Sequence, residues 1–389
     1  MSRSSPPSKH PARSPWLILT AVWLVAALAA SAQQPGSRTV GGYTWELPAN
    51  FPVPAVPADN PMSADKVALG KRLFFDARLS ANHAMACATC HDPARAFTDG
   101  LAQPVGITGE RLPRNAPSLV NVAYAGTLTW ANPTLTRLED QLRIPLLGTH
   151  PVEMGMGGRE AELIKRLKAD AGYQETFGKA FPDDPSPIGI DNLARAIASF
   201  ERTIISGTSP FDRFRVVDDP NAITPSARRG NLLFFSARLG CARCHGGPNL
   251  GRSAGYGSNL ADFFNIGLYN LGGTGKYPAG GEGVFTYTGK PEDMGRFKSP
   301  TLRNLALTAP YMHDGSVATL SEVIDDYAAG GRVIASGPYA GDGTKSPYKH
   351  ALIAGFTLTP EQKQDLLAFL DALTDKAFLA DPRFKAPAK

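Results

Sequence analysis

The chain has 389 residues, a formal net charge of +5 and 43% hydrophobic residues. This length exceeds what one hydrophobic core usually organises, so two modest domains are predicted. No run of charges indicates a nucleic-acid or membrane-surface partner, and only four cysteines are present.

The first 32 residues have the pattern of a secretory signal peptide. Arg3, Lys9 and Arg13 precede an apolar run at residues 16–30, and Ala-Ser-Ala at 30–32 is a small-residue cleavage site. The alternative is a membrane anchor, for which this run is short. We expect export with cleavage near Ala32, and no stable membrane span afterwards.

An internal repeat organises the rest of the chain. Gly, Leu, Phe-Phe, Ala, Arg and Leu recur in register between residues 70–80 and 230–240. Each segment is predicted to end an amphipathic helix, the first starting near Ser63 and the second near Thr224, with Pro225 at its first position. The period is too long for a solenoid, so a whole fold is duplicated.

Further helices are predicted at 159–171, 191–206 and 361–374, the last opened by a capping box that starts at Thr359. The Gly- and Tyr-rich stretch 251–289 is predicted to be a long loop, and strand signals are few. The boundary between the repeats is expected between Ser206 and Thr224.

Each repeated segment leads into a Cys-x-x-Cys-His pentapeptide, at residues 87–91 and 241–245. In this motif both cysteines form thioethers with haem vinyl groups, and the histidine ligates the iron. Two disulfides or a four-cysteine zinc site are the alternatives. Disulfides leave the repetition unexplained, and zinc leaves both histidines unexplained. The expected cofactors are therefore two covalently bound haem c groups, on Cys87, Cys90 and His91 and on Cys241, Cys244 and His245.

The predicted fold is mostly α, with two cytochrome c-like haem domains and long ordered loops. We assign residues 1–32 to the signal peptide, 33–210 to an N-terminal haem domain and 211–389 to a C-terminal haem domain. Because c-type haem is attached outside the bacterial cytoplasm, the expected location is the periplasm.

The mature chain resembles the bacterial diheme cytochrome c peroxidase/MauG superfamily over nearly its whole length. The stretches that carry this resemblance are residues 95–100 (Arg-Ala-Phe-Thr-Asp-Gly), 113–119, 138–141, 151–155, 297–304 and 309–315 (Ala-Pro-Tyr-Met-His-Asp-Gly). The resemblance implies an enzyme that acts on hydrogen peroxide, with a peroxidatic haem domain at 33–210 and an electron-transfer haem domain at 211–389.

The resemblance suggests an open distal face at the first haem. Family peroxidases that need reductive activation carry a ligating histidine in the loop after the first motif, where this chain has Ile107. Isoleucine cannot bind iron; His83 and His150 are possible substitutes. Glu153 matches the family's distal acid–base glutamate, and Gln141 matches its glutamine partner at a spacing two residues longer than expected.

At the second haem, the resemblance assigns the distal ligand to Tyr327. Peroxidases of the family have a methionine about a dozen residues after the segment ending at Gly315, and tyrosine there is the MauG pattern. A phenolate stabilises oxidised iron, whereas a thioether favours ferrous iron. Alternatively, Tyr327 is a core aromatic and Met294 or Met312 is the ligand.

Two further assignments come from the resemblance. Trp130 matches a tryptophan between the haems that can carry an electron hole; its alternative is core packing. Asn115, Thr308 and Pro310 match an interdomain calcium site built from oxygen donors. The chain departs from MauG at residues 238–240 (Arg-Leu-Gly), where MauG has a surface tryptophan just before its second haem motif.

The segments 43–48 (Tyr-Thr-Trp-Glu-Leu-Pro) and 128–133 are similar to MauG-like enzymes found beside copper-handling proteins, including those of methanobactin clusters. The implied function is peroxide-driven formation of a high-valent (bis-ferryl) state that oxidises a residue, such as Trp, on a periplasmic protein substrate. One alternative is a peroxidase that takes electrons from a small cytochrome or cupredoxin as its redox partner. The other is a non-catalytic electron-transfer cytochrome. No nucleic-acid partner is expected.

Overall fold

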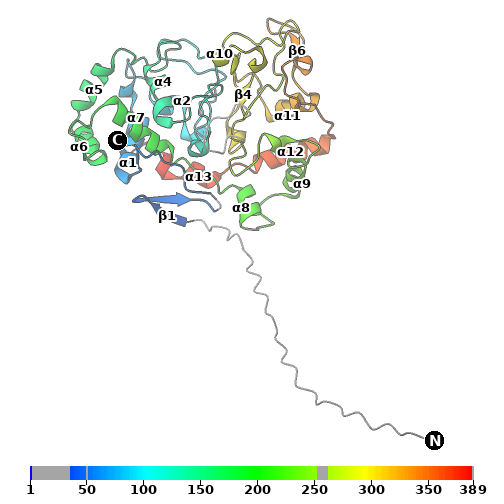
Figure 1. Cartoon of the computed structure of the whole chain (residues 1–389), viewed down its shortest axis with the longest axis horizontal. Helices are drawn as coiled ribbons and strands as arrows, with labels where there is room; N and C mark the ends of the chain where they lie inside the picture. The colour runs from blue at the N-terminus through cyan, green and yellow to red at the C-terminus, as the bar shows by residue number, and fades with distance from the viewer. Residues whose placement is uncertain (2–35, 50, 252–261, 388–389) are drawn as a thin grey trace. The chain divides into compact units, whose positions relative to one another are not determined.

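The computed structural model describes residues 1, 36–49, 51–251 and 262–387, and the predicted signal peptide lies outside them apart from Met1. Residues 33–389 form one compact unit that is mostly helical, as predicted (Figure 1). Among the described residues, none of the helices has the length and apolar character needed to cross a bilayer.

Helices of the first half alternate with long loops: α1 (Ala64–Phe74), α2 (Cys87–Cys90), α3 (Leu138–Gln141), α4 (Arg143–Leu147), α5 (Glu160–Lys168), α6 (Ala171–Ala180) and α7 (Ile190–Glu201). The second half contains α8 (Pro210–Val216), α9 (Pro225–Phe234), α10 (Phe285–Thr288), α11 (Leu320–Ala329), α12 (Pro360–Asp371) and α13 (Lys376–Ala380). The described strands form three short antiparallel pairs: β1 (Gly36–Val40) with β2 (Tyr43–Leu47), β3 (Phe263–Phe264) with β4 (Phe297–Lys298), and β5 (Val333–Ile334) with β6 (Gly341–Asp342).

The predicted helix starts are confirmed. Ser63 and Thr224 accept hydrogen bonds from the third residue of α1 and α9, and Thr359 forms a capping box at α12. The helix predicted over 159–171 is shorter: α5 ends at Lys168, because Asp170 caps a further helix, α6. In the stretch predicted to be a long loop, 251–289, residues 252–261 lie outside the described residues, and the part from residue 262 contains β3 and α10.

The repeated glycine marks a helix crossing in each half. α1 packs on α7, and α9 packs on α12. A Cβ added to Gly70 would lie 1.9 Å from the Ala196 carbonyl oxygen, and one added to Gly230 would lie 1.9 Å from the Asp365 carbonyl oxygen. Only glycine allows such a close backbone approach, so the duplicated sequence encodes a duplicated helix pair.

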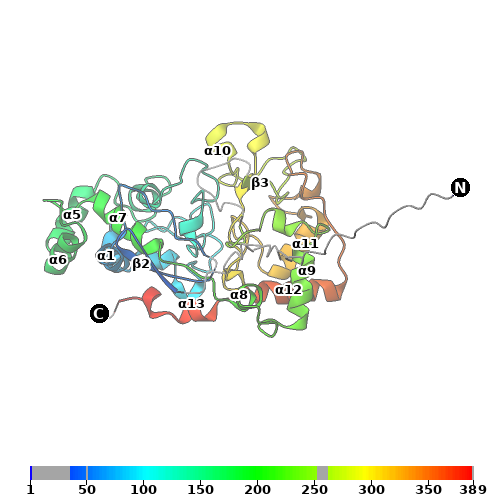
Figure 2. The same ribbon diagram turned by 60° about the horizontal axis from the view of Figure 1, so that its bottom comes forward.

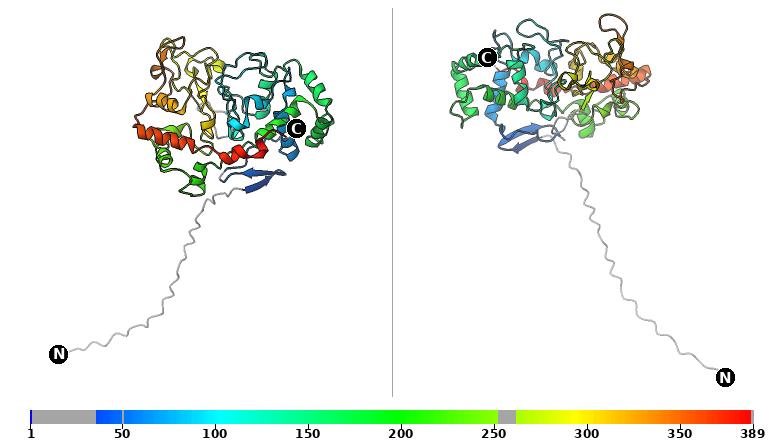
Figure 3. Two further views of the ribbon diagram at one scale, coloured as in Figure 1. Left: turned by 180° about the vertical axis from the view of Figure 1, so that it is seen from behind. Right: turned by 45° about the horizontal axis from the view of Figure 1, so that its top comes forward.

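Two large hydrophobic clusters fill the compact unit. The first extends from Leu69 to Ile204 and also includes Phe378 and Phe384; the second extends from Phe211 to Leu373. The end of the chain therefore returns to the first cluster, and Figures 2 and 3 show α13, in red, leaving the α9–α12 pair for the side of α1. The division into domains at residue 210 stays a prediction.

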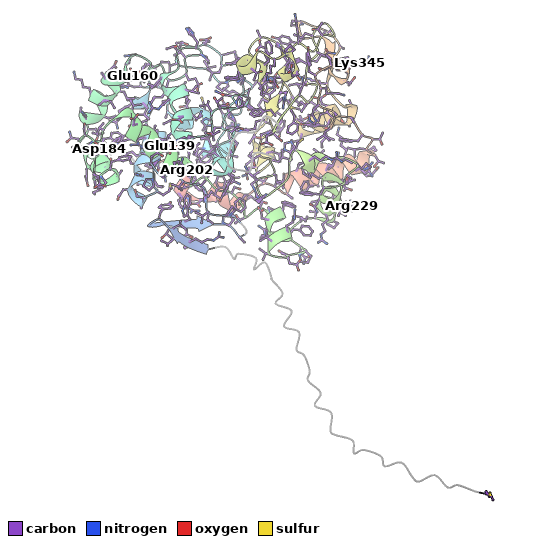
Figure 4. The ribbon with its side chains drawn as sticks, in the orientation of Figure 1. Glu139, Glu160, Asp184, Arg202, Arg229 and Lys345 are labelled. Carbon is purple, nitrogen blue, oxygen red and sulfur yellow. The ribbon has the colours of Figure 1, made fainter. Side chains whose placement is uncertain are left out.

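Buried ion pairs brace both halves. In the first half, Arg202 contacts Glu139 at 2.9 Å, and Figure 4 shows the two side chains close together. In the second half, Arg303 contacts Asp212 at 2.7 Å. Each pair is almost fully shielded from water, so removing one partner would leave an uncompensated buried charge.

Candidate haem sites

The first Cys-x-x-Cys-His motif forms α2 and ends at His91, whose amide donates to the Cys87 carbonyl at 3.0 Å. His91 Nδ1 lies 3.0 Å from the Phe97 carbonyl oxygen. Burial lowers the pKa of His91, which favours neutral imidazole. Since Nδ1–H can donate to this carbonyl, Nε2 remains available for a metal.

Ile107 lies beside Glu153. This is expected if both residues face the same side of the first haem. The Ile107 amide donates to the Glu153 carbonyl at 2.9 Å, and a Cβ added to Gly155 would lie 2.4 Å from Ile107 Cδ1. The pKa of Cys90 is raised to about 12 by burial and then by the charges of Asp99 and Glu153. Glu153 is therefore electrostatically close to the thiol that would attach the haem.

Burial raises the pKa of Glu153 to about 7. The cause is the loss of water around the carboxylate, because no basic side chain offsets it. A carboxyl group with this pKa can both hold and release a proton near neutral pH, which is what general acid–base catalysis needs.

The other residues predicted near the first haem make no comparable contacts with Ile107 or Glu153 among the described residues. Gln141 ends α3 and is half-buried, and no hydrogen bond links it to Glu153 within the described chain. His83 and His150 are both exposed. The geometry thus brings Ile107 and Glu153 together and leaves Gln141 as a neighbour in sequence.

The second motif forms a 3-10 turn followed by His245, in a cavity of about 450 Å³. His245 Nδ1 lies 3.3 Å from both the Leu250 carbonyl oxygen and Ser299 Oγ. Burial lowers the pKa of His245 to about 4. The cavity has a mostly apolar lining that includes Cys241, Cys244, His245, Phe264, Leu268, Leu366 and Leu370, as a haem requires.

Tyr327, on α11, also lines this cavity. Burial holds the pKa of Tyr327 above its ordinary range, and the nearby negative charge of Asp326 acts in the same direction. Its hydroxyl makes no hydrogen bond to the described residues. Met312 lines the same cavity, whereas Met294 is not among its lining residues.

Trp130 and the three predicted calcium ligands share the cavity lining as well. Trp130 Nε1 donates to the Asn115 carbonyl at 2.8 Å. The Asn115 side-chain amide donates to the Leu101 carbonyl, which leaves its oxygen free among the described residues. Asn115, Thr308 and Pro310 therefore present the oxygen-donor type that suits calcium.

The two alternatives to haem attachment find no support here. No disulfide joins any of the four cysteines, all of which lie among the described residues. Within the described residues, no group of three or more His, Cys, Asp or Glu side chains could hold a metal ion.

Two side chains at the cavity have a chemistry that was not assigned from the sequence. Lys298 Nζ donates to the Thr127 carbonyl at 2.9 Å, and burial lowers its pKa to about 8. His313 stacks on Phe297 with ring centroids 3.6 Å apart, and its Nε2 is buried without a partner in the described chain. Both residues lie in stretches that carry the family resemblance. Membership of those stretches was the sequence feature that could have pointed to them.

Comparisons with known proteins agree with this geometry. The Di-haem cytochrome c peroxidase family matches residues 64–220. The methylamine utilization protein MauG of Methylorubrum extorquens is 36% identical over 319 residues, which is 82% of this chain and 80% of that protein. The chain belongs to the diheme cytochrome c peroxidase and MauG family.

Other relatives come from both branches. Cytochrome c551 peroxidase of Pseudomonas aeruginosa is 34% identical over 68% of this chain and 72% of its own length. The crystal structure of a MauG-like protein associated with microbial copper homeostasis is 48% identical, with a TM-score of 0.85, over 89% of this chain and 99% of that one. The diheme peroxidase BthA of Burkholderia thailandensis shares the fold, with a TM-score of 0.65 at 23% identity over 92% of this chain and 98% of its own.

The family assignment settles the class of chemistry. The protein is a diheme c-type oxidoreductase that reacts with peroxide, and its cytochrome c-like fold is confirmed. The two Cys-x-x-Cys-His motifs remain the predicted attachment sites of the two haems. The assignment of individual site residues stays a prediction.

Proposed function

We propose that this enzyme uses hydrogen peroxide to oxidise a residue, such as Trp, on a partner protein in the periplasm. The observation that carries the proposal is the position of Tyr327 in the second haem cavity, with its hydroxyl free of hydrogen bonds to the described residues. A phenolate ligand stabilises oxidised iron and so suits storage of an oxidising equivalent. The 48% identity to a MauG-like protein supports the same branch.

The proton steps fall to Glu153. The haems, when bound, supply the redox chemistry. Glu153 takes a proton from one peroxide oxygen and returns it to the other, while Ile107 keeps the pocket without a competing side-chain ligand. The balance is H2O2 plus two protons and two electrons to two waters, and the partner's residue supplies the electrons.

Trp130 serves in the proposal as the route for the electron hole. Its ring borders the second cavity, and its indole N–H is fixed by the Asn115 carbonyl. Since residues 238–240 carry no aromatic side chain, the hole must leave toward the partner by another surface than in MauG.

The peroxidase alternative also has a specific observation in its favour, because Met312 lines the same cavity as Tyr327. A Met312-ligated haem would receive electrons from a small cytochrome or cupredoxin. The identity of the distal ligand of the second haem, Tyr327 or Met312, therefore distinguishes the two functions.

The deciding test replaces the candidate ligands one at a time. Tyr327→Phe should change the absorption and EPR spectra of the second haem, and Tyr327→Met should retain the haem with a raised reduction potential. Met312→Leu and Met294→Leu are the matched controls and should leave that haem unaltered. A second haem that responds to Met312→Leu and ignores Tyr327→Phe would establish the peroxidase alternative. In the resting ferric wild-type protein, EPR should show one high-spin haem.

We further propose one calcium ion held by oxygens of Asn115, Thr308 and Pro310, with water completing the shell. Because Asn115 also holds Trp130 and its amide donates to the His313 carbonyl at 2.8 Å, removing the ion should disturb both. Chelation should shift Trp130 fluorescence and slow peroxide-driven oxidation, and added Ca²⁺ should restore both. Calcium content below one per chain in the active protein would contradict this site.

A further inference from the structure

The turn that presents the Phe97 carbonyl to His91 is strained. Ala96 and Phe97 have φ values of +51° and +61°, which are unfavourable for residues with a side chain. Such a backbone conformation is unfavourable in free energy and persists only when the surroundings of the residue enforce it. Both residues are fully buried, so packing must supply the constraint.

Part of that packing comes from the far end of the chain. The Phe97 ring contacts Phe378 and Phe384, each with ring centroids 6.2 Å away, and these two rings contact each other at 4.9 Å. Phe74, on α1, covers another side of the Phe97 ring at 6.0 Å. We call residues 376–384 the C-terminal strap.

The strap is fastened at both ends. Asp375, directly before it, accepts hydrogen bonds from the amides of Gly207 and Thr208 at 3.1 and 2.8 Å. Near its other end, Lys71 Nζ donates to the Pro382 carbonyl at 3.0 Å. Hydrogen bonds near both ends therefore hold the strap in place where it packs against the Phe97 turn.

We propose that the C-terminal strap holds the Phe97 carbonyl on His91 and so sets the electron density of the proximal imidazole at the first haem. Phe378 and Phe384 are positioning residues, since they act through Phe97. A carbonyl that accepts from Nδ1–H makes an imidazole a stronger donor to the metal, which lowers the metal's reduction potential and favours peroxide cleavage.

The second haem site also has a buried residue with positive φ, Leu250 (φ +48°), which presents its carbonyl to the histidine, but the strap residues belong to the first hydrophobic cluster, so this site serves as an internal reference. His245 Nδ1 is 3.3 Å from the Leu250 carbonyl, and Ser299 Oγ is at the same distance. Leu250 lies in the second hydrophobic cluster, apart from the strap residues. Strap variants should therefore change the first haem and leave the second unchanged.

The experiment uses the haem-loaded protein with Phe384→Ala, Phe378→Ala and the milder Phe384→Leu. Phe177→Ala is the matched control: Phe177 is also fully buried in the first cluster, but its ring contacts are with Tyr173 and Phe181. The readouts are the reduction potential of each haem and the Fe–His stretching frequency of the reduced first haem.

The alanine variants should raise the potential of the first haem, lower its Fe–His frequency and slow its peroxide reaction by about 10–100-fold, the usual effect of losing a partner of a metal ligand. Phe384→Leu should give a smaller shift in the same direction, and it keeps the test available if the alanine variants do not fold. The second haem and Phe177→Ala should show no such shift.

Folded strap variants with an unchanged first-haem potential and Fe–His frequency would overturn the proposal. So would an equal shift in Phe177→Ala, since the effect would then be general core damage. The inference depends on haem ligation by His91 and not on Tyr327 or the partner protein. The wild-type spectra test the proposed function, and only the difference between variant and wild type tests the strap.

Discussion

Glu153 is the residue whose environment most directly implies a chemical role. Its side chain is buried, with a pKa raised to about 7, and its backbone carbonyl accepts a hydrogen bond from the amide of Ile107. An ordinary surface glutamate would be fully ionised at neutral pH. Burial alone therefore moves the pKa of Glu153 close to neutral pH, where the carboxyl group can exchange protons during the reaction.

Peroxide activation should depend on pH through this group. Because the carboxylate is the form that accepts the first proton, the rate should rise with pH to a plateau above about 7. Glu153→Gln should lower the rate by roughly 10²–10⁴-fold and abolish the pH dependence, since an amide cannot relay a proton. Stopped-flow mixing with peroxide from pH 5.5 to 8.5 measures both.

Glu110→Gln offers a control, because Glu110 is an exposed glutamate in the loop that carries Ile107. Its rate and pH profile should match the wild type. A Glu153→Gln rate within about threefold of wild type would remove Glu153 from the mechanism.

At the scale of secondary-structure elements, the duplicated helix crossing tolerates no side chain at its glycine. In Gly230→Ala the new Cβ would meet the Asp365 carbonyl oxygen at 1.9 Å and Phe369 Cβ at 2.8 Å, so α9 and α12 must separate. Overpacking of this kind costs about 1–3 kcal/mol of unfolding free energy or more. Denaturant unfolding should show that loss.

Gly178→Ala is the control for this prediction. Gly178 lies in α6, with open space where a Cβ would be, so alanine should stabilise the protein by about 0.5–1 kcal/mol through helix propensity. If both variants were stabilised, the close crossing of α9 and α12 would not exist in solution.

The elements also show what a sequence can reveal. The haem motifs, the helix caps at Ser63 and Thr359 and the repeated Phe-Phe segments are local patterns, so the helix starts and the duplication were predictable. Packing of Phe384 on Phe97 joins residues almost 290 positions apart, and the Ile107–Glu153 contact depends on two loops. No local periodicity encodes such contacts, and so the carbonyl partner of His91 was not foreseen.

At the scale of the whole molecule, one buried carboxylate joins the two halves. Asp375 is fully buried, and its oxygens accept hydrogen bonds from the Ser206 and Thr208 hydroxyls and the Phe378 amide. Its own amide donates to Asn304 Oδ1 at 2.7 Å. The segment after α7, the Asn304 turn and the C-terminal strap therefore meet at a single side chain.

Loss of this carboxylate should loosen the molecule as a whole. Asp375→Ala leaves several buried donors without an acceptor, and each costs about 1–3 kcal/mol, so unfolding free energy should fall by at least about 3 kcal/mol. Asp375→Asn retains one acceptor oxygen and should fall between that variant and wild type. Because the strap loses its anchor, the reduction potential of the first haem should also shift in the direction expected for Phe384→Ala.

Asp371→Ala is the control, because Asp371 is an exposed carboxylate on α12. It should change neither the unfolding free energy nor the reduction potential. Thermal unfolding followed at the absorption bands of the haems, together with a redox titration, measures both effects. If Asp375→Ala matched wild-type stability, the link between the halves would reside elsewhere, in the Asp212–Arg303 pair or the clusters themselves.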